Sequence, residues 1–150
     1  MKKMMFAAMM AVLASCATAQ DTKDIQLLAP NKDKGASIMK SLAQRQSHRK
    51  CADKELSTAD LSDLLWAANG INRPEDNKRT APSALNRQDI DVYVISKTGA
   101  YKYIAAENRL QLITEGDHRD AVASGQDFVN QFPVSLVLVS ELSKLGDAKN

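Results

Sequence analysis

Apolar residues recur at helical spacing in the first half of the chain and at alternate positions in much of the second half. The first helical pattern covers residues 37–45. Its apolar members, Ile38, Met39 and Leu42, fall on one side of a helix. Ser37 suits an N-cap, because its hydroxyl can accept a hydrogen bond from a free backbone N–H of the first turn. We therefore expect a short helix that ends at about the last residue of this range.

The clearest helical pattern is LSTADLSDLLWAANG, residues 56–70. Ser57 and Asp60 stand in the relation of a capping box, with Asp in place of the usual Glu. The apolar stripe behind them consists of Leu61, Leu64, Leu65 and Ala68. Gly70 stands where a helix would stop, and we expect Trp66 to pack in the core.

From residue 90 onwards apolar and polar residues alternate, which predicts strands. The alternating segments, which short turns connect, are residues 90–97, 100–105 and 109–115. They predict an antiparallel meander, and residues 117–132 then predict one or two short helices broken at Gly125. Residues 134–142 form a nearly continuous apolar run, which is typical of a strand buried on both faces. This order of helices and strands indicates an α+β fold.

Residues 1–19 have the pattern of a bacterial secretory signal peptide, in which a basic start precedes an apolar run and small residues. The apolar run is too short to span a bilayer, so no transmembrane segment is expected. We expect cleavage between Ala19 and Gln20 and a periplasmic mature protein. The alternative is a lipoprotein signal, which would leave the mature chain anchored by a lipid on Cys16.

The mature chain is expected to have a polar leader without regular structure at residues 20–36, followed by one domain at residues 37–150. The whole chain carries 20 basic and 18 acidic residues, and removal of Lys2 and Lys3 with the signal leaves 18 of each. A balanced charge gives no general attraction to nucleic acid or to an anionic membrane surface. We therefore expect no nucleic-acid partner.

No obvious acid, base or nucleophile pair stands out in the sequence. His48 and His118 are far apart, and neither has a second metal ligand at suitable spacing. Ser47 beside His48 is not a nucleophile pair, because adjacent residues rarely face each other and no elbow motif surrounds them. If the protein is an enzyme, we expect a cofactor to carry its reaction, without a catalytic side chain or a metal site.

A basic cluster, QRQSHRK, follows the first predicted helix. Because alternate residues of an extended segment point to the same side, Arg45, Ser47 and Arg49 would converge on one face. Two guanidinium groups with a hydroxyl between them suit a phosphate monoester, to which they can donate charge-assisted hydrogen bonds. His48 and Lys50 would point to the other side. The alternative is a solvated basic surface.

A second candidate element lies in the long polar connection of residues 69–89. Pro82 stands where it could open a helix, which would leave the backbone N–H groups of Ser83 and Ala84 free. Free donors at a helix start can hold an electron-rich edge of a ligand, and small residues let a flat ring approach the backbone. Asn86 adds a side-chain amide. The alternative is a capped turn that joins helix and strand.

Three segments, RQSHR, LSDLLWAANGINR and RTAPSALNRQDIDVYV, resemble in their order and spacing the FMN-dependent nitroreductase family, in particular its exported members. The resemblance runs from about Asp24 to Ser140. It implies an α+β fold with a central, mainly antiparallel sheet flanked by helices, and a homodimer with FMN in its interface. It also implies electron transfer from NADH or NADPH through the flavin to nitroaromatics, quinones or similar small acceptors, by a ping-pong mechanism.

The resemblance also implies which residues contact the cofactor. The residues that the family's pattern places against FMN are Arg45, Ser47, Arg49, Pro82, Ser83, Ala84 and Asn86. The first three would contact the phosphate and the ribityl chain, and the next three would lie along the isoalloxazine ring. The asparagine would contact the flavin or the substrate.

Two departures from the family pattern leave alternatives open. Cys51 stands where the family usually has an aromatic residue, and the family's chains continue beyond the position of Asn150. One alternative is a non-catalytic envelope protein that binds flavin or a partner without turnover. Another is a flavin-dependent dehydrogenase that oxidises a peptide-derived ring.

Overall fold

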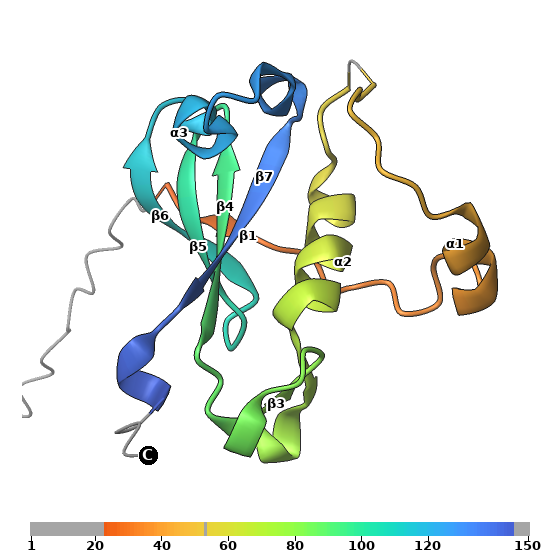
Figure 1. Ribbon diagram of the computed structural model, residues 1–150. Helices are drawn as coiled ribbons and strands as arrows, with labels where there is room; N and C mark the ends of the chain where they lie inside the picture. Colours follow the sequence, from red (N-terminus) through yellow and green to blue (C-terminus); the bar gives the residue numbers. More distant parts are fainter. Residues whose placement is uncertain (1–22, 53, 146–150) are drawn as a thin grey trace, which may run out of the picture.

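One helix covers one face of a five-stranded antiparallel sheet, which confirms the expected α+β class (Figure 1). The computed structural model describes residues 23–52 and 54–145. The expected signal peptide, its cleavage point and Cys16 lie outside the described residues. Within the described ranges no helix has both the length and the apolar character needed to cross a membrane.

All strands of the main sheet run antiparallel to their neighbours. Their bounds are β1 Ile25–Gln26, β4 Ile90–Ser96, β5 Gly99–Ile104, β6 Arg109–Glu115 and β7 Val134–Ser140. Their spatial order is β1-β6-β5-β4-β7. The expected meander is confirmed, because β4 pairs with β5 and β5 pairs with β6, with Val94 opposite Tyr101 and Tyr103 opposite Leu110.

The helical segments lie before, between and after these strands. Their bounds are α1 Ile38–Gln44, α2 Thr58–Asn69, α3 Arg119–Ala123 and the 3-10 segments η1 Pro74–Asp76, η2 Ala84–Asn86, η3 Asp127–Gln131 and η4 Leu142–Leu145. A small hairpin follows α2 and consists of β2 Ile71–Arg73 and β3 Lys78–Arg79. The two expected N-terminal helices and the short helices after the meander are therefore confirmed.

The core lies between α2 and the inner face of the sheet. Its buried members are Leu27, Leu61, Leu65, Val92, Val94, Tyr101, Tyr103 and Leu110. Leu65 and Leu110 have no exposed surface, so helix and sheet meet around these two side chains. Burial of a leucine side chain stabilises the fold by about 1.5–3 kcal/mol relative to leaving it in water.

Local interactions set both ends of α2, as the sequence predicts. Ser57 accepts a hydrogen bond from the backbone N–H of Asp60 at 3.1 Å, and its hydroxyl donates to the Asp60 carboxylate at 2.7 Å. Gly70 ends the helix where the chain folds back on Trp66. A Cβ at this glycine would lie 2.7 Å from the Trp66 carbonyl oxygen, so a larger residue does not fit.

Ser57→Ala is expected to lower the free energy of unfolding by about 1 kcal/mol, because it removes the N-cap acceptor of α2. Denaturant unfolding followed by tryptophan fluorescence measures this loss. Ser41→Ala, at an exposed position inside α1, is the control and should not destabilise the protein, because alanine is the better helix former. Equal losses in the two variants would contradict a capping role.

Two apolar side chains of α2 lie outside the core, in contrast to the expected packing. Leu64 is 41% exposed, and Trp66 is half-buried. The ammonium of Lys32 lies 5.4 Å from the centroid of the indole, and the indole N–H donates to the carbonyl of Ile71 at 3.2 Å. The apolar stripe of α2 is wider than the sheet face against which the helix packs. The side chains at the margins of the stripe therefore face the leader, residues 20–36, or solvent.

The leader contains a strand where irregular chain was expected. β1 pairs with β6, and Leu27 is buried in the core. The carboxylate of Asp24 accepts a hydrogen bond from the backbone N–H of Leu112 at 2.8 Å. The hydroxyl of Ser62 accepts one from the backbone N–H of Leu28 at 3.0 Å, which ties the leader to α2. These partners are distant in the sequence, so the local pattern does not reveal them.

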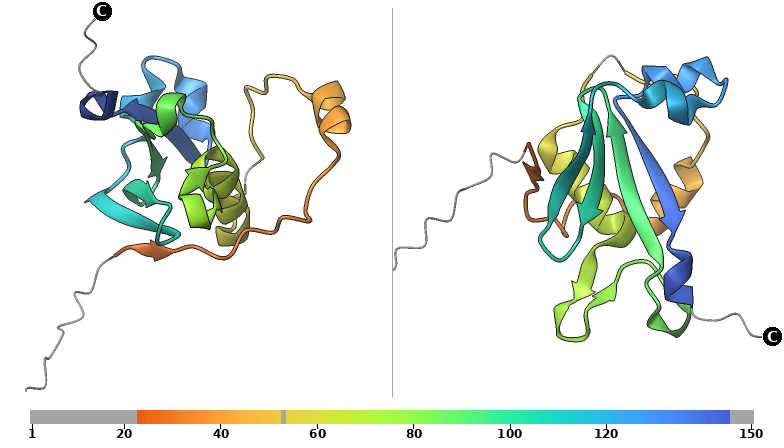
Figure 2. Two further views of the ribbon diagram at one scale, coloured as in Figure 1. Left: turned by 90° about the horizontal axis from the view of Figure 1, so that it is seen from below. Right: turned by 90° about the vertical axis from the view of Figure 1, so that its left-hand side faces the viewer.

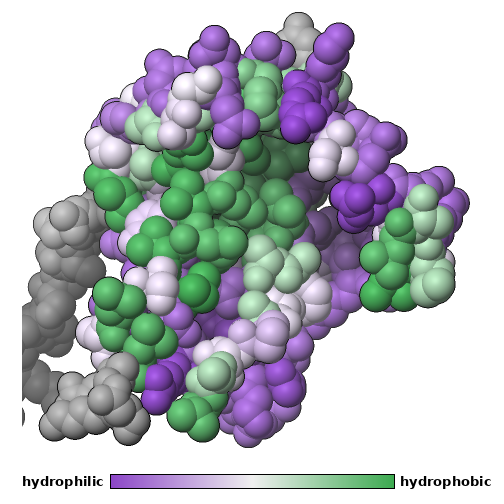
Figure 3. All heavy atoms as spheres, viewed as in Figure 1, coloured by the Kyte–Doolittle hydropathy of each residue, from purple (hydrophilic) through white to green (hydrophobic). Residues whose placement is uncertain are grey.

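β7 is an edge strand, and the expectation of a strand buried on both faces is wrong. Among the described strands it pairs with β4 alone, and Leu138 and Val139 are 65% and 43% exposed. Apolar side chains gather over β7 in the view of Figure 3. An apolar run by itself does not separate an interior strand from an edge strand, because that depends on which segment pairs beside it.

Candidate functional site

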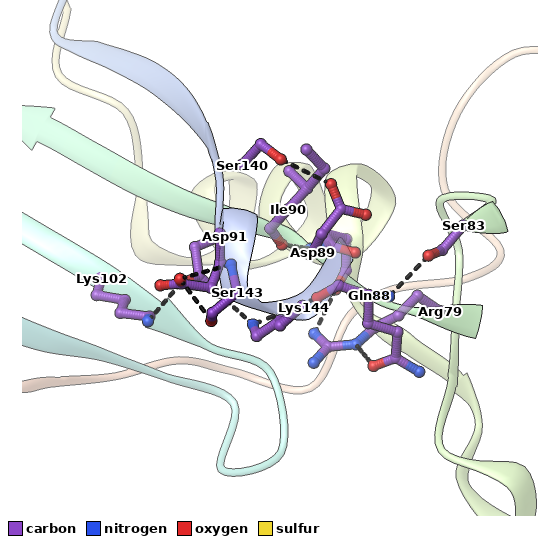
Figure 4. Close-up of polar contacts among 12 residues, drawn as sticks. Arg79, Ser83, Gln88, Asp89, Ile90, Asp91, Lys102, Ser140, Ser143 and Lys144 are labelled. Carbon is purple, nitrogen blue, oxygen red and sulfur yellow. Dashed lines mark hydrogen bonds and ion pairs between the residues drawn. The ribbon is translucent and has the colours of Figure 1, made fainter. Parts of the chain in front are cut away.

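The chain between β3 and β4 forms a tight loop beside the C-terminal end of α2, and we call residues 80–89 the site loop (Figure 4). At its start, the hydroxyl of Thr80 donates to the carbonyl of Trp66 at 3.0 Å. At its end, the side-chain amide of Asn69 donates to the carbonyl of Ile90 at 2.9 Å. Both ends of the loop are therefore held against the same helix.

Pro82 does not open a helix, so this part of the sequence-based prediction is wrong. Ser83 follows it in an extended conformation, with φ of −140° and ψ of 127°. The 3-10 turn η2 begins only at Ala84 and contains Leu85 in the left-handed conformation. A right-handed helix does not continue through a left-handed residue, so no regular helix N-terminus forms here. Whether these residues contact a cofactor stays a prediction.

The site loop holds three non-glycine residues in the left-handed conformation, namely Leu85 (φ 53°), Asn86 (φ 53°) and Gln88 (φ 47°). Each such conformation costs about 1–3 kcal/mol and persists only where the surroundings hold it. Here the hydroxyl of Ser83 accepts from the backbone N–H of Gln88 at 2.7 Å, and the Gln88 amide donates to the carbonyl of Asn77 at 2.7 Å. Such strain is common at binding sites.

Two hollows flank the site loop. The α2 hollow, of about 270 Å³, lies between the loop, the end of α2 and the sheet, and the hairpin hollow, of about 280 Å³, faces the β2–β3 hairpin. The apolar residues that line the α2 hollow are Ala68, Ala81, Pro82, Ile90 and Leu138. The polar residues that line it are Asn69, Arg79, Ser83, Gln88 and Asp89. Apolar surface combined with polar groups is typical of sites that bind small organic ligands.

Arg79 lies between the two hollows and lines both. Its Nε donates to the side-chain oxygen of Gln88 at 3.0 Å, and its Nη1 donates to the carbonyl of Asn69 at 3.1 Å (Figure 4). In the part of the chain that the structure describes, it forms no ion pair with a carboxylate. Burial raises the pKa of Tyr103, and the positive charge of Arg79 opposes that rise.

The C-terminal end of β7 supports the other end of the loop. The hydroxyl of Ser140 donates to the carboxylate of Asp89 at 2.9 Å, and the backbone N–H of Glu141 donates to the carbonyl of Asp89 at 2.7 Å. The ammonium of Lys144 donates to the carbonyl of Gln88 at 3.3 Å (Figure 4). The loop is thus held by α2 on one side and by β7 and η4 on the other.

A cluster of ion pairs continues this support. The carboxylate of Asp91 lies 2.6 Å from the ammonium of Lys102 and 3.5 Å from that of Lys144. Burial raises the pKa of Asp91, but the hydrogen bonds and charges of the two lysines outweigh burial and leave that pKa below its usual value. The hydrogen bond to Asp91 raises the pKa of Lys102. Asp91 and Lys102 therefore stay charged at neutral pH. This is the behaviour of an ion pair that holds the structure together and not of a pair that exchanges protons.

Arg45, Ser47 and Arg49 lie on an exposed segment without regular structure after α1. This segment leads to the N-terminal end of α2, whereas the site loop lies at the C-terminal end of the same helix. Figures 1 and 2 show α1 and the chain around it standing away from the sheet. Within one chain, the structure therefore keeps the two parts of the predicted FMN contact set apart.

Among the described residues, no group of three or more His, Cys, Asp or Glu side chains is placed to hold a metal ion. The thiol of Cys51 donates to the carbonyl of Gln131 at 2.7 Å, and the ring of His118 is hydrogen-bonded to the carbonyl of Glu115 at 2.9 Å. Both side chains thus contact backbone groups.

Three residues that build the site, namely Arg79, Asp89 and Lys144, are not among those predicted from the sequence. Arg79 directly precedes the segment TAPSALNRQ, and this position beside the motif could have identified it as a site residue. Asp89 and Lys144 belong to segments that meet because β7 pairs with β4. No local pattern in the sequence marks such a meeting.

Comparison with known proteins gives one family. Residues 42–149 match the nitroreductase family. A crystal structure from Ralstonia eutropha JMP134, described as a "putative nitroreductase", resembles this fold with a TM-score of 0.78 and 34% sequence identity. The match covers 89% of this chain and 63% of that one, so this chain spans less than two thirds of the length of that relative. No curated protein sequence matches the chain.

Proposed function

The chain belongs to the nitroreductase family, and from this premise we propose that it is an FMN-dependent oxidoreductase that passes electrons from NAD(P)H to a small acceptor such as a nitroaromatic compound or a quinone. The observation that carries this proposal is the strained site loop beside a hollow that both apolar and polar side chains line.

The residues present fit FMN in their chemistry. The side chains of Arg45 and Arg49 are exposed, and neither forms an ion pair with a carboxylate among the described residues. Both guanidinium groups can therefore donate hydrogen bonds to a phosphate. Pro82 and Ser83 border the α2 hollow with small side chains that allow close approach of a ring. The volume of about 270 Å³ is just below the range of about 300–1,000 Å³ that is usual for ligand pockets. The hollow is therefore expected to hold part of the flavin.

We propose that a second copy of the chain supplies the remaining contacts. Ile38, Met39 and Leu42 of α1 are 75%, 72% and 60% exposed, and Figure 3 shows an apolar patch on α1 apart from the rest of the molecule. A contiguous apolar patch of this kind marks a protein interface. We propose that in this homodimer the basic segment of one subunit lies beside the site loop of the other.

In the proposed complex, the bound flavin supplies the redox chemistry, and the protein binds and orients it. Arg45 and Arg49 would donate charge-assisted hydrogen bonds to the phosphate, and Ser47 would contact the phosphate or the ribityl chain. Residues 82–84 would form the wall along the ring, and Asn86 would contact the flavin or the acceptor. None of these roles requires a side chain to transfer a proton.

We also propose that the protein is exported. The support is the basic start, the apolar run and the small residues of the segment that ends at Ala19. The mature chain would begin at Gln20 and act in the periplasm, and the alternative is a lipid anchor on Cys16. Mass spectrometry of the protein from the envelope fraction distinguishes these forms, because lipidation adds the mass of the acyl chains.

The purified mature chain is expected to bind FMN and to oxidise NADH or NADPH when a nitroaromatic compound or a quinone is added. Flavin absorption measures the first property, and loss of NAD(P)H absorption measures the second. A colourless protein that FMN does not reconstitute would contradict the proposal. Flavin binding without NAD(P)H oxidation would instead identify a non-catalytic flavin-binding protein.

A further inference from the structure

Arg79 is a half-buried cation whose hydrogen-bond partners are neutral. Its two donated bonds go to the side chain of Gln88 and to the carbonyl of Asn69. None of the described ion pairs includes its guanidinium. Removal of a positive charge from water is unfavourable, so a cation in this position usually has an anionic partner. The C-terminal end of α2 supplies only a partial negative charge.

The place of Arg79 indicates where such a partner would lie. The guanidinium borders both hollows beside Pro82 and Ser83. Its Nε and Nη1 are held by protein atoms, and Nη2 donates to no atom of the described residues. Figure 4 shows the Arg79 guanidinium and the Gln88 amide side by side. Arg79 is therefore a cation in a fixed position, with one free donor group at the edge of an apolar hollow.

We propose that Arg79 binds the electron-rich, carbonyl-bearing edge of the flavin ring and that its charge raises the midpoint potential of the bound flavin. This inference rests on the proposed function, because it takes FMN as the ligand. A guanidinium donates strong hydrogen bonds to carbonyl oxygens and to negatively charged ring edges. The half-buried apolar residues Ala68 and Ala81, which line the same hollow, reduce the screening of this interaction by water.

The effect on the potential follows from charge. A flavin that has accepted two electrons carries more negative charge than the oxidised flavin, so a nearby fixed cation binds the reduced form more tightly. Arg79 would then differ from a residue that only caps α2, because a cap alters folding but does not distinguish the two redox forms. The midpoint potential is therefore the measurement that separates the two roles.

Arg79→Gln in the mature, FMN-loaded protein is expected to weaken binding of the reduced flavin about tenfold more than binding of the oxidised flavin, which lowers the two-electron midpoint potential by ~30 mV. Arg79→Lys should retain most of the wild-type potential, because the lysine keeps the charge. Arg87→Gln is the matched control, since Arg87 is exposed on the same loop and lines neither hollow. It should leave the potential unchanged.

A second variant keeps the inference testable if Arg79→Gln does not fold. Gln88→Glu retains an acceptor for Arg79 and places a carboxylate against the guanidinium, so it should lower the potential in the same direction. If the wild-type protein binds no FMN, both the proposed function and this inference are contradicted. A wild-type protein that binds FMN, with an unchanged potential in the folded Arg79→Gln or Gln88→Glu variant, would overturn this inference alone.

Discussion

Replacement of both Arg45 and Arg49 by alanine is expected to weaken FMN binding by about a hundredfold or more. Each substitution removes a charge-assisted hydrogen bond to the phosphate, worth roughly 1.5–3 kcal/mol, and about 1.4 kcal/mol corresponds to a tenfold change in affinity. Both side chains are exposed and contact no described carboxylate, so their removal should not disturb folding. Fluorescence titration of the apoprotein with FMN measures the Kd.

Two controls separate a phosphate contact from a general loss of charge. Lys50→Ala removes a cation from the same basic cluster, but its side chain is expected to point away from the phosphate, so the Kd for FMN should change little. Riboflavin lacks the phosphate and should bind the double variant as well as it binds the wild type. Equal weakening of riboflavin and FMN, or no weakening of FMN, would contradict the assignment of Arg45 and Arg49.

Leu65→Ala is expected to lower the free energy of unfolding by about 2–5 kcal/mol. Leu65 has no exposed surface and lies where α2 meets the sheet, so its truncation loses buried apolar contact and leaves a cavity. Domains of ordinary stability have only about 5–15 kcal/mol in total, so this loss is large enough to unfold part of the population at elevated temperature. Denaturant unfolding monitored by circular dichroism measures the change.

The neighbouring residue provides a matched control for this core substitution. Leu64→Ala makes the same chemical change one position earlier in α2, at a side chain that is 41% exposed. It should cost clearly less, because much of that side chain is in water in the folded state as well. Similar losses at positions 64 and 65 would mean that α2 does not turn this face to the sheet.

The helices and the meander could be predicted because each depends on residues that are close in the sequence. The Ser57 cap lies within one turn of the N–H that it accepts, and Gly70 stops the helix through contact with Trp66 of the preceding turn. β4, β5 and β6 follow one another through short turns, so their alternation also fixes which faces meet. The predictions failed where a distant segment decides burial, as at β1, β7 and Leu64.

In the candidate site, too, some features depend on residues that are close in the sequence and others on segments that are distant. From the residues alone it is clear that two arginines flank a serine in one short segment and that small residues follow Pro82, and these motifs were enough to indicate the family. Where these groups lie in space depends on the folded chain. The left-handed turn of the site loop, the place of Arg79 between two hollows, and the support of the loop by β7 and η4 become visible only in the structure. The position of a charge relative to a cavity depends on contacts between α2, β4 and β7, which are far apart in the chain and meet only when it folds.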